Sequence, residues 1–323
     1  MPELPDVAIY VEHLAARTIG KPLNHVRFAS PFVLRTAVPP IREAEGRVVR
    51  RVFRLGKRIV FELDGDRFLV IHLMVAGRFR WLAENAKLPG KIGLAAFDFP
   101  GGTLALTEAS TKKRAAIHFV IGEAAARELH RGGIEPLEIS LEEFAGAVRR
   151  ENHTLKRTLT DQRFLSGIGN AYSDEILFEA QLSPLKHSAT LDDADMKRLY
   201  DATRAVLTSW VERLRAVYAQ GFPEGVTAFR EEMKVHGRYG KPCPRCGAPV
   251  QRIVHADNEI NYCAGCQTGG KLLADRSLSR LLGKDWPKTL EELEDKRPAA
   301  ILKPNPARST RAPKKTAARE PTS

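Results

Sequence analysis

The pattern of apolar and polar residues changes along the chain and divides it into regions of different predicted structure. Residues 5–18 place apolar side chains at helical spacing and stop at Gly20, which predicts an amphipathic helix. From 25 to 122 short runs alternate between apolar and polar residues, and turn sequences such as Asp64-Gly65-Asp66 separate them. This alternation predicts an antiparallel β domain in the form of a sandwich.

Beyond residue 124 the spacing of apolar residues becomes helical. A cysteine-containing module follows Gly240, and the segment from 296 onward is rich in Pro, Ala, Lys, Arg and Thr. Such a composition buries too little apolar surface to fold alone, so this tail is predicted to be disordered. The predicted helices of the middle region are 141–150, 154–161, 171–181 and 191–219.

Length and charge limit the class of protein. The chain has 323 residues, 43% of them hydrophobic, which is enough for two domains with cores. The net charge of +12 suggests a polyanionic partner, but residues 296–323 hold eight Lys or Arg and one Glu, so +7 belongs to the tail and +5 to the rest. Neither an uncharged apolar run of about 18 residues nor a secretory signal is present, so a cytoplasmic protein without a membrane span is expected.

The cysteines form two Cys-x2-Cys pairs separated by 16 residues, all within a window of 24. In a chain without a secretory signal this spacing favours a metal site over disulfides. Four thiolates match tetrahedral zinc, and a closed shell of sulfur ligands leaves no open position for catalysis. One structural zinc ion is therefore predicted on Cys243, Cys246, Cys263 and Cys266.

A glycine-rich connection between two predicted helices, Ser166-Gly167-Ile168-Gly169-Asn170, is a second candidate site. Glycines let backbone N–H groups approach a ligand, and the first turn of a helix adds partial positive charge. The pattern therefore predicts phosphate binding at Gly167 and Gly169. An ordinary helical hairpin with a glycine turn, in which Asn170 only caps the second helix, fits the same residues.

The third candidate is the start of the chain, Met1-Pro2-Glu3. Proline at position 2 permits removal of the initiator methionine, which would expose a secondary amine. A terminal amine has a pKa near ~8, against ~10.4 for lysine, so a useful fraction is neutral at physiological pH. A neutral amine can attack a sugar C1′ and form an iminium, and Glu3 stands beside it as an acid or base. This tripeptide is common in proteins, so by itself it does not indicate this chemistry.

Jointly these segments resemble the formamidopyrimidine-DNA glycosylase and endonuclease VIII family across about residues 1–268. The matching segments are Met1–Val7, the glycine turn and Val235–Cys246, in the family's order and separation. The resemblance implies an α+β multidomain fold. Its expected parts are an N-terminal antiparallel β-sandwich with a leading helix (the catalytic domain, 1–123), a helical domain with a helix–two-turn–helix unit (124–236), a zinc β-ribbon (237–272), and an extension with a basic tail (273–323).

The resemblance also implies an activity, base-excision repair by a DNA glycosylase that is also an AP lyase. Its partner is double-stranded DNA with damaged bases, oxidised purines first among them, or abasic sites; the lesion is flipped out of the duplex. Pro2 displaces the base and forms the iminium, Glu3 transfers protons, and Lys57 is the third catalytic residue. A monomer near the nucleoid is expected. The DNA-contacting positions implied by the match are His72, Met74 (or Val75, as a wedge), Gly167, Gly169 and Asn170, with Lys112, Lys113 and Asn258 at altered positions.

The altered positions depart from the family pattern. Asn258 stands five residues before the third cysteine, where the family has a phosphate-gripping arginine. An amide lacks the charge and the bidentate fork, so weaker lesion binding, loss of δ-elimination, or compensation by Arg252 is expected. The segment with Lys112 and Lys113 has no aromatic residue to stack in the gap left by the flipped nucleotide. Residues 218–229 are short where relatives carry a lesion-capping loop.

Two other functions remain open from the sequence. A non-catalytic protein that binds damaged DNA would keep the scaffold and lose the chemistry, and the presence of Pro2, Glu3 and Lys57 argues against it. An RNA- or ribosome-associated zinc protein would explain the basic tail, but the long β region at the start of the chain does not suit it.

Overall fold

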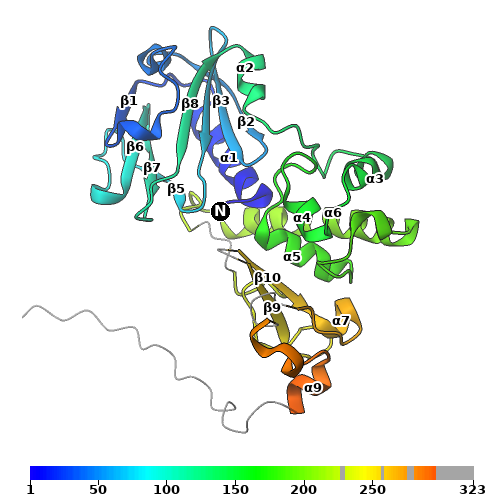
Figure 1. The fold of residues 1–323 in the computed structure, drawn as a ribbon. Helices are drawn as coiled ribbons and strands as arrows, with labels where there is room; N and C mark the ends of the chain where they lie inside the picture. Colours follow the sequence, from blue (N-terminus) through cyan, green and yellow to red (C-terminus); the bar gives the residue numbers. More distant parts are fainter. Residues whose placement is uncertain (226–229, 256–257, 275–279, 296–323) are drawn as a thin grey trace, which may run out of the picture.

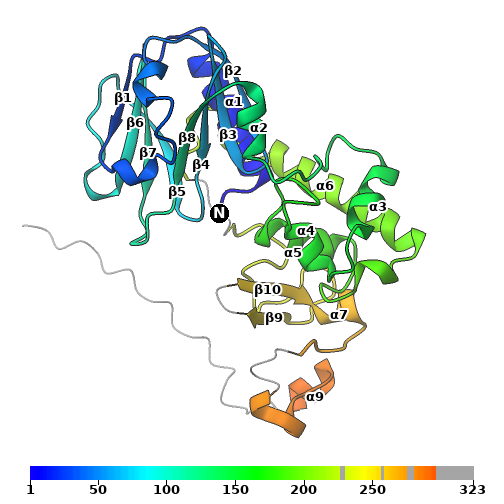
Figure 2. The same cartoon turned by 45° about the horizontal axis from the view of Figure 1, so that its top comes forward.

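The computed structural model describes residues 1–225, 230–255, 258–274 and 280–295. A β-sandwich, a helical region and a small β-ribbon follow one another along the chain (Figure 1). The N-terminus lies between the sandwich and the helical region, as both Figure 1 and Figure 2 show. The predicted disordered tail, 296–323, lies outside the described residues.

Eight strands form two four-stranded antiparallel sheets, with the orders β1-β6-β7-β5 and β2-β3-β4-β8. The inward faces of both sheets supply one apolar core that includes Phe61, Phe79 and Phe119. The strands are β1 (His25–Phe28), β2 (Val49–Leu55), β3 (Arg58–Leu63), β4 (Arg67–His72), β5 (Gly77–Leu82), β6 (Gly93–Phe99), β7 (Gly102–Glu108) and β8 (Ala116–Ile121).

The leading helix α1 (Leu4–Thr18) joins the sandwich to the helical region. Tyr10 and Leu14 belong to the sandwich core, whereas Leu4 and Ile9 belong to the core of the helical region. A helix that is apolar on two faces is stable only when both faces are covered, and here each domain covers one. The residues that precede α1 are thereby fixed at the junction of the two domains.

In the helical region α1, α3 and α5 pack against the long helix α6, and α4 packs against α5. Local signals set the helix starts: Ser140 and Glu143 form a capping box for α3, and Asp192 accepts the N–H of Asp195 at the start of α6. The helices are α2 (Glu123–Glu128), α3 (Leu141–Arg149), α4 (Leu155–Thr160), α5 (Asn170–Glu179) and α6 (Asp193–Val217). Short 3-10 turns occupy Pro31–Val33, Ile41–Ala44, Gly90–Ile92, Ser188–Thr190 and Gly283–Asp285.

The ribbon consists of the hairpin β9 (Val250–His255) and β10 (Asn258–Cys263), followed by α7 (Ala264–Thr268). The hairpin packs on α5, so the ribbon is attached to the helical region (Figure 2). In the extension, Lys271 pairs with Thr289, and Leu293 of α9 (Leu290–Asp295) packs in a cluster with Tyr262. Part of the extension is therefore ordered against the ribbon.

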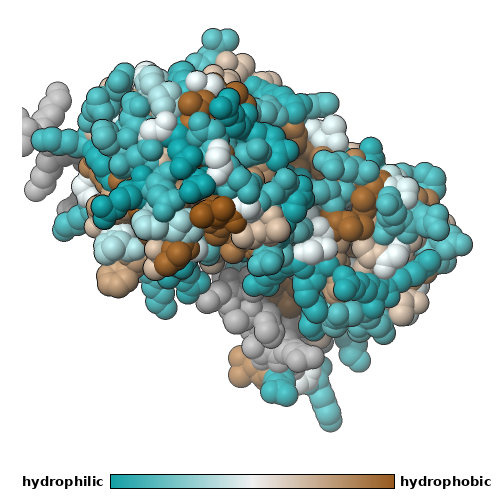
Figure 3. All heavy atoms as spheres, turned by 90° about the horizontal axis from the view of Figure 1, so that it is seen from above, coloured by the Kyte–Doolittle hydropathy of each residue, from teal (hydrophilic) through white to brown (hydrophobic). Residues whose placement is uncertain are grey.

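These observations confirm the predicted fold class of a β-sandwich, a helical domain and a C-terminal ribbon. The segment with Lys112 and Lys113 is a connection and not a strand, because β7 ends at Glu108 and β8 begins at Ala116. None of the described helices is long and apolar enough to cross a membrane. On the face drawn in Figure 3, apolar side chains form small separate patches within a mainly hydrophilic surface.

Candidate active site at the domain junction

The carboxylate of Glu3 occupies the N-terminus of helix α5. It accepts hydrogen bonds from the N–H groups of Gly169 (2.6 Å), Ala171 (2.9 Å) and Tyr172 (3.2 Å). The side chain is buried, with the residue only 2% exposed. Backbone donors at a helix N-terminus stabilise a carboxylate through hydrogen bonds and the helix dipole. A residue from the start of the chain is thus held by a segment 166 residues away.

Lys57 faces Glu3 across Gly169. It lies with Gly56 in the two-residue turn that joins β2 to β3, and Gly56 supplies the positive φ (+62°) that such hairpin turns require. A Cβ added at Gly169 would stand 2.5 Å from Glu3 Cδ and 2.6 Å from Lys57 Nζ, so glycine is the residue that lets these groups meet. Burial lowers the pKa of Lys57, and the charge of Glu3 partly opposes that shift.

The α-amino group at this end of the chain, on Met1, is also enclosed. Burial lowers its pKa, the charge of Glu3 raises it, and the guanidinium of Arg78 on β5 lowers it further. A buried terminal amine near cations is neutral at lower pH than a free one, which favours nucleophilic reactivity. The sequence marked Glu3 and Lys57 but missed Arg78, because no local motif surrounds it.

The N–H groups of Gly167 and Gly169 in the glycine turn both have partners within the protein. The N–H of Gly169 is taken by Glu3, and that of Gly167 donates to Gln162 Oε1 (2.9 Å). Gly167 has φ +83°, and its carbonyl accepts the N–H of Leu4 (2.9 Å). This helix terminus thus holds the protein's own carboxylate, and DNA contact at Gly167 and Gly169 stays a prediction.

Asn170, the predicted phosphate contact, points to the zinc ribbon. Its Nδ2 donates to the carbonyl of Glu259 on β10 (2.9 Å), and its side chain makes no capping hydrogen bond to α5. Lys156 Nζ donates to the Asn170 carbonyl (2.6 Å) and to the buried carboxylate of Asp174 (2.5 Å). Because the same carboxylate accepts the N–H of Asn261 in β10 (3.1 Å), these contacts tie α5 to the ribbon hairpin.

Asn258 is the first residue of β10, and its side chain lies outside the described part of the structure. Arg252, expected as its possible substitute, pairs across the hairpin with Asn261. Its guanidinium lies 4.3 Å from the ring centroid of Tyr239 and 3.4 Å from Glu259 Oε2. Arg252 is therefore engaged within the ribbon and partly neutralised.

The remaining predicted contacts lie on loops or strand ends of the sandwich. His72 ends β4, and burial with the charges of Arg58 and Lys57 lowers its pKa to about 3, so the ring is neutral at pH 7. Met74 lies in the following turn with φ +54°, not in a strand, and Val75 beside it is exposed. The exposed segment with Lys112 and Lys113 joins β7 to β8.

The cysteine side chains converge at the base of the ribbon, with all four Sγ atoms within 4.8 Å of one another. Cys243 and Cys266 Sγ lie 3.9 Å apart, and Cys246 and Cys263 Sγ lie 3.4 Å apart. Zinc bound tetrahedrally at about 2.3 Å from each sulfur requires separations of about 3.8 Å. The donor set fits one structural zinc ion, as predicted.

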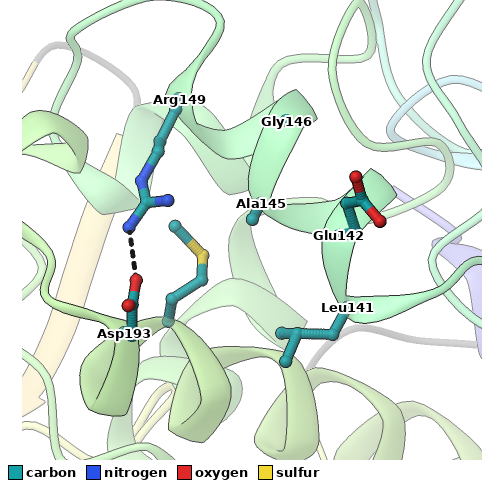
Figure 4. A pocket seen from close by; sticks show the side chains of 7 residues that line it. Leu141, Glu142, Ala145, Gly146, Arg149 and Asp193 are labelled. Atoms are coloured by element: carbon teal, nitrogen blue, oxygen red, sulfur yellow. Dashed lines mark hydrogen bonds and ion pairs between the residues drawn. The ribbon is translucent and has the colours of Figure 1, made fainter.

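A separate surface pocket lies between α3 and α6 (Figure 4). Arg149 and Asp193 pair at its edge (3.2 Å), and Leu141, Ala145 and Gly146 form part of its wall. It shares no residue with the Glu3 site. Its one ion pair is exposed, and an exposed pair contributes little energy or reactivity.

These features define a two-domain protein with a zinc ribbon, in which the N-terminal residues and a lysine meet on a helix terminus. Residues 1–117 match the formamidopyrimidine-DNA glycosylase N-terminal domain, 133–218 the H2TH domain of the same enzymes, and 240–269 a zinc finger found in FPG and IleRS. The chain belongs to the formamidopyrimidine-DNA glycosylase family, whose members are base-excision-repair glycosylases with AP lyase activity.

Relatives align over nearly their whole length. The formamidopyrimidine-DNA glycosylase of Heliobacterium modesticaldum is 33% identical over 83% of this chain and 100% of its own. The crystal structure of the MutM (Fpg) protein of Thermus thermophilus is 33% identical, with a TM-score of 0.70 over 82% of this chain and 98% of that one. A complex of the Lactococcus lactis Fpg with abasic-site DNA shares the fold, with 24% identity and a TM-score of 0.74 over 82% and 99%.

Proposed function

We propose that this chain removes oxidised bases, purines foremost, from double-stranded DNA and cuts the strand at the resulting abasic site. The nucleophile is the secondary amine of Pro2 after removal of Met1. The observation that supports this best is the position of Glu3, the residue next to Pro2. Its carboxylate is held by three N–H groups at the N-terminus of α5 and faces Lys57.

In the proposed reaction the Pro2 nitrogen attacks C1′ of the damaged nucleotide, and the bond from C1′ to the base breaks. The base leaves with a proton, and opening of the sugar ring gives an iminium between Pro2 and C1′. Glu3 serves as the acid and base for these proton transfers. Loss of a C2′ proton then expels the 3′ phosphate, and hydrolysis of the iminium frees Pro2.

In this proposal Lys57 places its amino group beside the reacting sugar. Its lowered pKa follows from burial, and Glu3 supplies the nearest opposing charge. The neutral His72 can donate a hydrogen bond to a phosphate but adds no charge near pH 7. We propose Met74 as the wedge into the duplex, because it lies in a turn (φ +54°) beside the exposed Val75. The site acts on DNA as a monomer and meets its substrate on the nucleoid.

The test is borohydride trapping on duplex DNA with an abasic site. Reduction of the iminium gives a covalent adduct, and mass spectrometry of the digested adduct locates the attached residue. We expect attachment at Pro2 and no adduct from a matched protein that retains Met1, because its Pro2 nitrogen is an amide. A protein without Met1 that binds this DNA but forms no adduct, or forms it elsewhere, would contradict the mechanism.

A panel of duplexes then tests the base. Oxidised purines, ring-opened purines and oxidised pyrimidines, each opposite cytosine and opposite adenine, are compared in single-turnover reactions. Faster release of oxidised purines supports the proposal, and faster release of oxidised pyrimidines overturns that part of it. The product ends also report on Asn258, which stands in place of the expected arginine. A 3′ phosphate on the cut strand shows that δ-elimination follows β-elimination, and its absence shows that the reaction stops after β-elimination.

A further inference from the structure

Arg230 reaches from the segment before the zinc ribbon to Asp6 in the first turn of α1, 224 residues away. Its Nη2 lies 2.9 Å from Asp6 Oδ1, and the two side chains are only 10% and 0% exposed. Removing both charges from water is costly, and loss of one partner of such a buried pair would leave the other charge uncompensated. The contact is therefore a built feature of the interior.

The second oxygen of Asp6 completes the arrangement. Asp6 Oδ2 accepts the N–H of Glu3 at 3.0 Å. One buried carboxylate thus connects the guanidinium of Arg230 to the backbone of the residue next to Pro2. The side chain of that same residue is fixed by α5. The N-terminal peptide is held from two sides, and Arg230 is the charged group on one of them.

We propose that Arg230 is a positioning residue for the N-terminal nucleophile: it holds the Asp6 carboxylate, which fixes the peptide of Glu3 and so aims Pro2. The inference rests on the proposed function of Pro2. Arg230 itself does not touch the reacting atoms in this scheme. It acts through Asp6, and a displaced Pro2 nitrogen would attack C1′ less often, since reaction depends steeply on such alignment.

Phe222 offers a matched control on the same connecting segment. Its ring packs on Tyr10 and His13 of α1 and on Trp81 of β5, with centroid distances of 5.9, 6.2 and 6.2 Å. Like Arg230 it attaches the segment to α1, but its ring partners lie beyond the first turn. A shortened side chain at Phe222 weakens the attachment without removing a charge from the neighbourhood of Asp6.

Arg230→Met leaves Asp6 buried without its cation. Burial already raises the pKa of Asp6, and the Glu3 N–H and the Arg230 charge oppose that rise. The other groups that face it are the Glu3 carboxylate, the terminal amine and the phenols of Tyr10 and Tyr172. None of these replaces the lost cation at Asp6, so its carboxyl takes up a proton at higher pH and becomes a poorer acceptor for Glu3.

The experiment measures single-turnover formation of the borohydride-trapped adduct on abasic duplex DNA from about pH 5.5 to about pH 9, with the dissociation constant for the same duplex. We expect Arg230→Met to be roughly tenfold slower at pH 7 with an unchanged dissociation constant, and to recover as the pH rises. Arg230→Lys, which keeps the charge, should retain the wild-type decline of the rate at low pH, the acid limb of the pH–rate profile. The double variant Asp6→Asn with Arg230→Met loses the added pH dependence.

Phe222→Leu should lower the melting temperature but keep the wild-type pH profile. The proposal is overturned if Arg230→Met keeps the wild-type rate and profile, or if Phe222→Leu shifts the acid limb equally. If Arg230→Met does not fold, the pH profile of Arg230→Lys decides. This variant keeps the charge, so a shift of the low-pH side of its rate profile to higher pH would refute positioning by charge. Absence of an adduct from the wild type would instead refute the proposed function.

Discussion

Gly169 separates Glu3 from Lys57, and its replacement by alanine tests whether their spacing controls the reaction. The added Cβ would stand 2.5 Å from Glu3 Cδ and 2.6 Å from Lys57 Nζ, where ordinary contacts are 3.4–4 Å. The backbone at Gly169 is extended (φ −133°, ψ −155°), a conformation open to any L-residue. Alanine therefore adds no backbone strain, and its effect falls on the two side chains.

The magnitude follows from the displacement. The Glu3 carboxylate must move by about 1 Å to restore contact distance, which disturbs its hydrogen bonds to α5. A misplacement of this size lowers a rate by about 100-fold, equivalent to ~2.7 kcal/mol of activation free energy. Replacing glycine with alanine also lowers the conformational entropy of the unfolded chain, which raises the stability of the folded protein by about 0.4–1 kcal/mol. A large loss of rate with a small change in stability is thus expected.

The assay is single-turnover adduct formation with saturating enzyme, together with thermal unfolding. Gly146→Ala on α3 is the control, because an added Cβ there meets nothing within 4 Å. It lies in the wall of the pocket in Figure 4, in a helix interior where glycine costs about 1 kcal/mol, so we expect a raised melting temperature and an unchanged rate. A folded, DNA-binding Gly169→Ala protein that reacts at the wild-type rate would refute the reasoning.

Three further results are expected. The pKa of His72 is lowered from 6.5 to about 3, so between those pH values only the unfolded chain binds this proton. The free energy of unfolding therefore decreases as the pH is lowered through that window. This costs the wild type about 2 kcal/mol between pH 7 and pH 5; His72→Gln avoids the loss, and equal pH dependence in urea unfolding would contradict it. Removal of zinc by a chelator, or Cys266→Ser, should unfold the ribbon and abolish tight DNA binding, because the thiolates meet through the metal; unchanged binding after measured loss of one zinc per chain would exclude this. Deletion of 296–323 removes eight cations and should flatten the salt dependence of binding without slowing single-turnover chemistry, which a slower rate would disprove.

Local patterns in the sequence predicted the elements well, because periodicity and caps act within a few residues. The helix predicted over 171–181 is observed as Asn170–Glu179, and the one over 191–219 as Asp193–Val217. The alternating region forms antiparallel strands as expected. The exact ends of strands, such as Glu108 and Ala116, are harder to predict, since they depend on pairing partners that the local pattern does not contain.

The candidate site was predicted as separate motifs and not as one arrangement. The start of the chain and the glycine turn were both identified, but nothing in either sequence states that Glu3 lies on the amides of α5. That contact depends on tertiary packing over 166 residues. A helix N-terminus attracts an anion in general, and only the fold determines that an internal carboxylate lies at this one.

Arg78 and Arg230 were missed for a related reason. Each is one of many arginines in a basic chain, and neither is part of a spaced motif. Their significance arises from their position near the N-terminal peptide. The alternating pattern of the strands does not reveal this position for Arg78. For Arg230, the partner Asp6 precedes it by 224 residues. Pairs of opposite charge at such separations are too numerous in a sequence for one of them to be selected.

The altered DNA-contacting positions change how charge is distributed around the substrate. On the ribbon, Asn258 is uncharged where the family resemblance predicts an arginine, and Arg252 is engaged by Glu259 and Tyr239. On the sandwich, Lys112 is exposed in the loop between β7 and β8, where it gains no stacking aromatic but remains available to phosphate. Since phosphate neutralisation dominates affinity for DNA, we expect the sandwich side to supply more of the charge and the described part of the ribbon hairpin to supply hydrogen bonds. If so, the strongest electrostatic contacts lie on the same domain as the proposed N-terminal nucleophile, and removing the charge of Lys112 should weaken DNA binding more than removing that of Arg252.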